Sequence, residues 1–181
     1  RLTEQKNFKL LIDAFYAFQK KHKEFVLEIC GEGPLLKELK QQCANLEIEE
    51  KVIFSGFVED VNYRMQRSYM YVSSSNFEGI SNSMLEAMAM GIPTICTNCP
   101  VGGAAIVIEN NKNGILVPVC NEKELINAME NIVSNQELRN EELHINNKTI
   151  FSCDFKNNKF DFKNLKYINA ETANIDRYLQ S

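Results

Sequence analysis

The chain has 181 residues, and its 44% hydrophobic and 24% charged side chains are typical of a globular protein long enough to bury a core. A net charge of −4 at pH 7 gives no support to a nucleic-acid partner, which usually requires a strongly basic face, so none is expected. Six cysteines include one CxxC pair, Cys96 and Cys99, but no second pair or nearby histidine completes a zinc site, so reduced thiols are expected.

A helix and a strand open the chain. Apolar side chains recur at helical spacing over Asn7–His22, which predicts an amphipathic helix capped by its first residue. The strand Phe25–Cys30 then enters a turn containing Gly31 and Gly33, before a helix over Leu35–Leu46. A strand, glycine turn and helix can bind a dinucleotide, but a leucine occupies the third glycine position of the G-x-G-x-x-G pattern. A tight turn therefore fits these glycines as well as ligand contact does.

The same alternation continues along the chain. The strand Lys51–Ser55 is followed by a turn over Gly56–Asp60, a short helix over Val61–Ser68 and the strand Tyr69–Ser73.

The stretch Asn76–Pro100 concentrates the candidate functional residues. Glu78 and Glu86 lie eight residues apart, around the start of an apolar, helix-forming run. A helix N-terminus attracts phosphate, and ionised carboxylates accept hydrogen bonds from sugar hydroxyls. Gly79 can adopt conformations closed to other residues and lets a ligand approach the backbone. Ser83 and Glu86 also fit the spacing of a capping box, in which Glu86 only bonds the Ser83 N–H, so spacing alone leaves both interpretations open.

The remaining elements complete an α/β pattern. They are the strand Thr94–Thr97, a flexible glycine loop before the apolar run Ala104–Ile108, the strand Ile115–Val119 and the helix Glu122–Val133. Alternating strands and helices predict a Rossmann-like parallel sheet with helices on both faces, and its ligand edge lies at the carboxyl ends of the strands. The pattern supports one domain over residues 1–147, whereas residues 148–181 form a tail of uncertain structure with one short helix expected over Ala170–Gln180.

Five motifs in order resemble one known family. RLTEQK, CGEGP, GFVED, EGISNSMLEAMAMGIP and NGILV are together similar to the C-terminal, donor-binding domain of retaining GT-B glycosyltransferases. These enzymes form the large family called glycosyl transferases group 1, or family 4. The likeness spans residues 1 to about 147 and implies one half of a two-domain GT-B fold. The N-terminal, acceptor-binding half is then a missing partner.

The resemblance implies a role for each matching residue. Arg1 and Lys6 match the basic pair that holds the donor diphosphate, and these two residues and Glu78, which faces the donor sugar, form the implied catalytic set. Glu86 matches the carboxylate that accepts from the ribose hydroxyls. The other donor-binding positions are Gly79, Ile80, Ser81 and Asn82 along the sugar and phosphates, Phe57 and Val58 near the nucleobase, and Gly31 and Gly33 in a turn flanking the cleft.

The implied reaction transfers a sugar from a nucleotide-diphosphate sugar to a hydroxyl of a glycan or lipid-linked acceptor, with retention, in polysaccharide or glycolipid synthesis. No DxD motif occurs, so no metal ion or other cofactor is expected. Because the chain begins at Arg1, we expect it to be part of a longer protein and inactive alone. Its expected location is the cytoplasm, with docking at the inner face of the membrane through the missing half.

The alternative interpretation is a non-catalytic module that binds a sugar nucleotide or another subunit. An adjoining Rossmann-like half in the full reading frame would favour the enzyme.

Overall fold

The computed structural model describes residues 1–135 and 149–153, and the helix expected over Ala170–Gln180 lies outside them. All strand pairings in this part are parallel, and the six strands of the sheet run in the order β2-β1-β6-β3-β4-β5. Their bounds are β1 Val26–Cys30, β2 Val52–Gly56, β3 Met70–Ser73, β4 Thr94–Asn98, β5 Ile115–Pro118 and β6 Thr149–Cys153.

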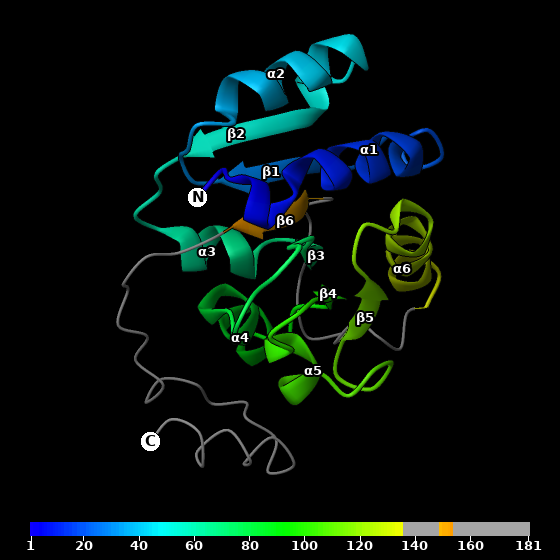
Figure 1. The fold of residues 1–181 in the computed structure, drawn as a ribbon. Helices are drawn as coiled ribbons and strands as arrows, with labels where there is room; N and C mark the ends of the chain where they lie inside the picture. The colour runs from blue at the N-terminus through cyan, green and yellow to red at the C-terminus, as the bar shows by residue number, and fades with distance from the viewer. Residues whose placement is uncertain (136–148, 154–181) are drawn as a thin grey trace.

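Helices cover both faces of this sheet (Figure 1). They are α1 Phe8–Gln19, α2 Leu36–Asn45, α3 Val61–Gln66, α4 Asn82–Ala89, α5 Gly103–Val107 and α6 Glu122–Ser134, with two 3-10 turns, η1 Glu4–Lys6 and η2 Glu49–Lys51. Successive residues of a strand point to opposite faces. Met70 and Val72 accordingly join the core under α1, α2 and α6, whereas Tyr71 joins the core under α3, α4 and α5. The predicted α/β sheet with helices on both faces is confirmed.

The centre of the sheet differs from the sequence-based expectation, which ended the strands at Ile115–Val119. A further strand, β6, lies between β1 and β3 and pairs with five residues of β1 but only two of β3. The segment was missed because five residues, of which only three are apolar, carry too little periodicity among Asn and Lys to identify a strand.

The first seven residues cross the carboxyl edge of the sheet. The Leu2 N–H donates to the Glu32 carbonyl beyond β1 (2.9 Å), and the Asn76 N–H beyond β3 donates to the Gln5 carbonyl (2.7 Å). Leu2 lies so close to Gly33 that a Cβ at that glycine would overlap the Leu2 backbone. Residues 1–7 therefore join the end of β1 to the end of β3, and Figure 1 shows the N-terminus beside the tip of β1.

Candidate functional site

The site lies at the point in the sheet where the order of successive strands reverses. β1 and β2 lie to one side of β6, and β3, β4 and β5 lie to the other. In open α/β sheets, ligands bind outside the carboxyl ends of the strands at such a switch point. Residues 1–7 cross this position, so their side chains and the loops after β1 and β3 form the edge that a ligand would meet.

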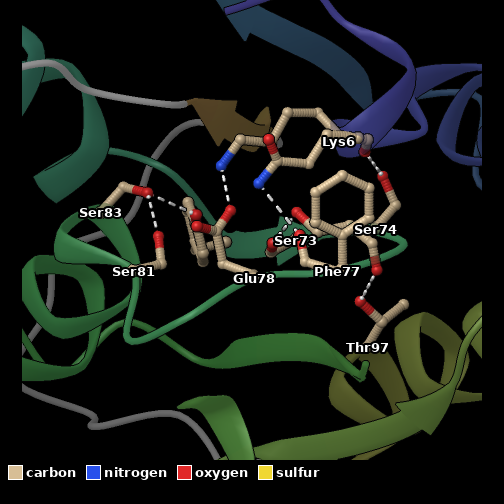
Figure 2. A network of polar contacts seen from close by, with 11 residues as sticks. Lys6, Ser73, Ser74, Phe77, Glu78, Ser81, Ser83 and Thr97 are labelled. Atoms are coloured by element: carbon tan, nitrogen blue, oxygen red, sulfur yellow. Dashed lines mark hydrogen bonds and ion pairs between the residues drawn. The ribbon is translucent and has the colours of Figure 1, made fainter. Parts of the chain in front are cut away.

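An ion pair between Lys6 and Glu78 marks this edge. Lys6 Nζ donates to Glu78 Oε2, and only 10% and 23% of the two side chains are exposed (Figure 2). The Lys6 carbonyl accepts from the buried Ser74 hydroxyl (2.9 Å), and the Glu78 N–H donates to the Pro100 carbonyl (3.3 Å). Both charged residues are thus held by their backbones as well as by each other. The structure places together two residues that the sequence assigned to different parts of a donor.

Hydrogen-bonded hydroxyl groups connect the loop after β3 to the neighbouring elements. The buried Tyr71 hydroxyl bonds Ser83 Oγ at 2.8 Å, and Ser83 Oγ bonds Ser81 Oγ at 2.9 Å (Figure 2). On the side of β4, Thr97 Oγ1 donates to the Ser75 carbonyl at 2.6 Å. These bonds tie the loop to two strands, which gives its backbone a fixed position.

Glu86 is not part of a capping box. Helix α4 begins at Asn82 with Ser81 as its N-cap, so Ser83 already lies in the first turn and cannot be the cap that the alternative interpretation required. Glu86 is only 4% exposed. In the part of the chain that the structure describes, no residue hydrogen-bonds its carboxylate or pairs with it. This burial raises the pKa of Glu86 to about 7.

The loop at Gly79 packs against the start of α5. A Cβ on Gly103 would overlap the backbone of Gly79 and Ile80, whereas a Cβ on Gly79 would meet nothing within 4 Å. Gly79 is outside the left-handed region, so it leaves open space over the backbone but does not need the special conformation that the sequence suggested. The loop Cys99–Gly103, expected to be flexible, forms a close backbone contact instead.

The other predicted residues lie at the ends of β1 and β2. The Gly31 N–H donates to the Gly56 carbonyl (2.7 Å), and the Arg1 backbone lies against Gly31. Phe57 follows with 77% of its surface exposed, and Val58 is half-buried. Two groups result, one around Lys6, Glu78–Asn82 and Glu86, the other around Arg1, Gly31, Gly33, Phe57 and Val58, with residues 1–7 spanning between them.

Sequence reasoning missed three residues that hold this edge, Ser74, Thr97 and Gly103. Only the adjacent pair Gly102 and Gly103 gave a usable signal, because paired glycines often mark a close backbone approach.

The described residues contain neither a metal-binding cluster nor a membrane-spanning helix. Residues 1–135 and 149–153 contain no group of three or more His, Cys, Asp or Glu side chains that could hold a metal ion. In the same ranges, no helix has both the length and the apolar character needed to cross a membrane.

A charged pair and a buried carboxylate lie at the switch point of this parallel sheet, where open α/β sheets bind ligands such as nucleotides. Comparison with known proteins identifies the family to which the chain belongs. The family Glycosyl transferases group 1 matches residues 1–148. The chain belongs to this family, and its fold is one half of the GT-B architecture.

Individual relatives agree with this assignment. The chain is 32% identical over 139 residues to the N-acetylgalactosamine-N,N'-diacetylbacillosaminyl-diphospho-undecaprenol 4-alpha-N-acetylgalactosaminyltransferase of Campylobacter jejuni. The alignment covers 77% of this chain and 37% of that relative. Anabaena HepE in complex with UDP superposes with a TM-score of 0.70 at 26% identity, covering 76% of this chain and 38% of HepE. The C-terminal domain of LpcC from Francisella tularensis shares the fold, with a TM-score of 0.70 at 24% identity and coverage of 80% and 77%.

The chain thus spans less than two fifths of the length of the Campylobacter relative and of HepE.

Proposed function

We propose that this chain binds the donor of a retaining glycosyltransferase, a nucleotide-diphosphate sugar, and presents it to an acceptor hydroxyl bound by another domain. The observation that carries the proposal is the buried carboxylate of Glu86, which has no partner among the described residues, on the helix that follows the Lys6–Glu78 pair. A desolvated carboxylate without a partner is costly for folding, so it indicates a role in binding. The hydroxyls of a ribose would supply the hydrogen bonds that the protein does not.

The charges at the edge suit the phosphates of such a donor. Lys6 is held beside Glu78, and the exposed Arg1 lies beyond Gly31 on the same crossing segment. As the glycosidic bond breaks, negative charge builds on the leaving diphosphate, and fixed cations stabilise it. We assign this stabilisation to Lys6 and Arg1 and no step to a metal ion.

Glu78 is assigned to the donor sugar and not to nucleophilic attack. Its pairing with Lys6 reduces the charge available for attack and fixes its carboxylate beside Gly79. The acceptor oxygen forms its bond to the anomeric carbon on the face from which the phosphate leaves, and a phosphate oxygen accepts the acceptor proton. Glycan or lipid-linked acceptors are proposed, supported by the undecaprenol-linked substrate in the name of the Campylobacter relative.

The first test is binding of nucleoside diphosphates without metal. UDP, GDP and ADP, each with its sugar conjugates, are added to the chain in a thermal-shift assay. A ligand that binds only the folded state and is present at 100 times its Kd stabilises that state by about 2.7 kcal/mol, which raises Tm by roughly 5 °C. If none of these ligands raises Tm and calorimetry detects no heat of binding, the donor site is not here.

A second test separates sugar from nucleotide contacts through Glu78→Gln. We expect this variant to lose about tenfold in affinity for the nucleotide-diphosphate sugar and to bind the bare nucleoside diphosphate nearly as well as the wild type, because one charge-assisted hydrogen bond to the sugar is weakened. Titration calorimetry with both ligands measures the difference. Equal losses for the two ligands would contradict the assignment of Glu78 to the sugar.

A further inference from the structure

An ion pair between the buried Glu28 and the exposed Arg64 joins β1, β2 and α3 outside the residues assigned so far. Glu28 lies in the middle of β1 with 9% of its surface exposed. Its Oε1 accepts from Ser55 Oγ at the end of β2 (2.6 Å) and from Arg64 Nη1 on α3 (2.7 Å). Neighbouring Leu27 and Ile29 point into the core on the opposite face of the sheet. Glu28 is therefore a charged residue set inside an apolar strand.

Stability alone does not account for this charge. Removing a carboxylate from water is costly unless it is hydrogen-bonded and paired, and an apolar residue at this position of the strand would carry no such cost. The bonds from Ser55 and Arg64 offset the cost of burying Glu28, and they hold the segments that carry these two residues beside β1. The segment that these bonds hold is the loop between β2 and α3.

The pair anchors both ends of the loop Gly56–Asp60. At its start, Glu28 holds Ser55, and the next carbonyl, that of Gly56, accepts from the Gly31 N–H. At its end, Arg64 Nε donates to Asp60 Oδ1 (3.4 Å), while Nη1 of the same guanidinium reaches Glu28. Arg64 thus bridges the last residue of the loop to β1.

Phe57 and Val58 lie between these two anchors. Phe57 is 77% exposed, so its own side chain supplies little burial to hold the segment in place. The conformation of Gly56 in the left-handed region (φ +64°) turns the chain at this point. Val58 packs against the core under α3, α4 and α5, so the position of residues 57 and 58 depends on this contact and on the anchors at either end.

We propose that Glu28 and Arg64 are positioning residues that hold the Gly56–Asp60 loop against the nucleobase of the donor. The inference rests on the proposed function and on the family resemblance, which implies that Phe57 and Val58 lie near the base. Neither Glu28 nor Arg64 touches the ligand, and both act through the loop. Their loss is expected to weaken the part of the affinity that depends on the base, and to leave the part that depends on the diphosphate.

The experiment compares Arg64→Met with Arg67→Met by calorimetry. Arg67 is the C-cap residue of the same helix and carries the same charge, but its guanidinium donates to the exposed Tyr63 hydroxyl. Two ligands are titrated, inorganic pyrophosphate and the nucleoside diphosphate that the wild type binds best. Arg64→Met is expected to lose about tenfold in affinity for the nucleoside diphosphate and less than about twofold for pyrophosphate. Arg67→Met is expected to change neither, and Arg64→Lys to recover most of the loss.

Amide hydrogen exchange supplies a readout without ligand. Exchange over residues 57–60 should quicken in Arg64→Met and stay at the wild-type rate in Arg67→Met. If Arg64→Met does not fold, the variant carrying both Glu28→Gln and Arg64→Gln removes the two charges together and is tested in the same way.

The outcomes separate the two proposals. A wild type that binds no nucleoside diphosphate overturns the proposed function. A wild type that binds, with an Arg64→Met variant that loses both ligands equally or loses neither, overturns the positioning role alone. Equal exchange rates over the loop in the two arginine variants would also overturn it.

Discussion

Glu86→Gln is expected to stabilise the folded chain at pH 8 and to weaken its affinity for nucleoside diphosphates. Glu86 as a residue is 4% exposed, and no residue of the described chain pairs with its carboxylate, so ionisation of this carboxylate in the folded state is unfavourable. Glutamine keeps the size of the side chain without the charge. If replacing a residue improves stability and harms binding, the native residue destabilises the fold and serves the function.

The gain in stability should depend on pH with a defined sign. Burial raises the Glu86 pKa from 4.5 to about 7, so the folded state binds more protons than the unfolded state between these values. Wild-type stability therefore falls as pH rises from about 4.5 to 7 and is lowest, as far as this group is concerned, above 7. The difference in pKa corresponds to about 3 kcal/mol, an upper estimate for the advantage of Glu86→Gln at pH 8. At pH 5 the advantage should be below about 1 kcal/mol.

Urea denaturation of both proteins at pH 5 and pH 8 measures this effect. Glu24→Gln, at an exposed glutamate, is the matched control and should change stability by less than about 0.5 kcal/mol at either pH. Affinity for the nucleoside diphosphate, measured at pH 8, should fall about tenfold in Glu86→Gln, because a charged acceptor for the ribose hydroxyls is lost. A Glu86→Gln variant that is less stable than the wild type at pH 8 would show that the carboxylate holds the fold together.

Gly103→Ala is expected to destabilise the chain by about 2 to 4 kcal/mol and to abolish most donor binding. The added methyl group would overlap the backbone of Gly79 and Ile80, and a backbone cannot move aside as the end of a flexible side chain can. The displaced segment is the one that follows Glu78, so the fault reaches the proposed sugar and phosphate contacts directly. Chemical denaturation gives the stability, and calorimetry with the nucleoside diphosphate gives the affinity.

Gly102→Ala is the control for this prediction. Gly102 has φ +75°, which disfavours other residues, but a Cβ there would meet nothing within 4 Å. The variant should therefore lose about 1 kcal/mol of stability and keep its affinity within about threefold. If Gly102→Ala loses as much affinity as Gly103→Ala, conformational strain in the loop, and not its contact with Gly79, controls the site.

The alternation of strands and helices made the fold predictable to within a few residues at most element ends. The N-cap Asn7 was correctly predicted, because its side chain accepts from Leu10 N. β6 was not predictable, since its position depends on partners more than seventy residues away and not on its own pattern. Local sequence does not encode which strand fills the centre of a sheet.

The site was predicted less completely than the fold. Motif resemblance identified Lys6, Glu78 and Glu86, and the structure brings the first two into contact. Motif resemblance could not reveal that Glu86 lacks a partner among the described residues, because this property depends on how the other elements pack around its side chain. The anchors Glu28 and Arg64 were missed for a similar reason, since a glutamate inside an apolar strand has no meaning until its partner on another element is known.

The place of β6 also bears on how the chain folds during synthesis. β1 and β2 can pair as soon as they leave the ribosome, and β3, β4 and β5 can do the same, but the strand between these two groups is made after the other five strands of the described sheet. Until then β1 and β3 each present an unpaired edge, and such edges invite association with other chains. The segment Arg1–Asn7 is hydrogen-bonded to residues just beyond β1 and β3, and it can hold the two groups of strands in register until β6 is added.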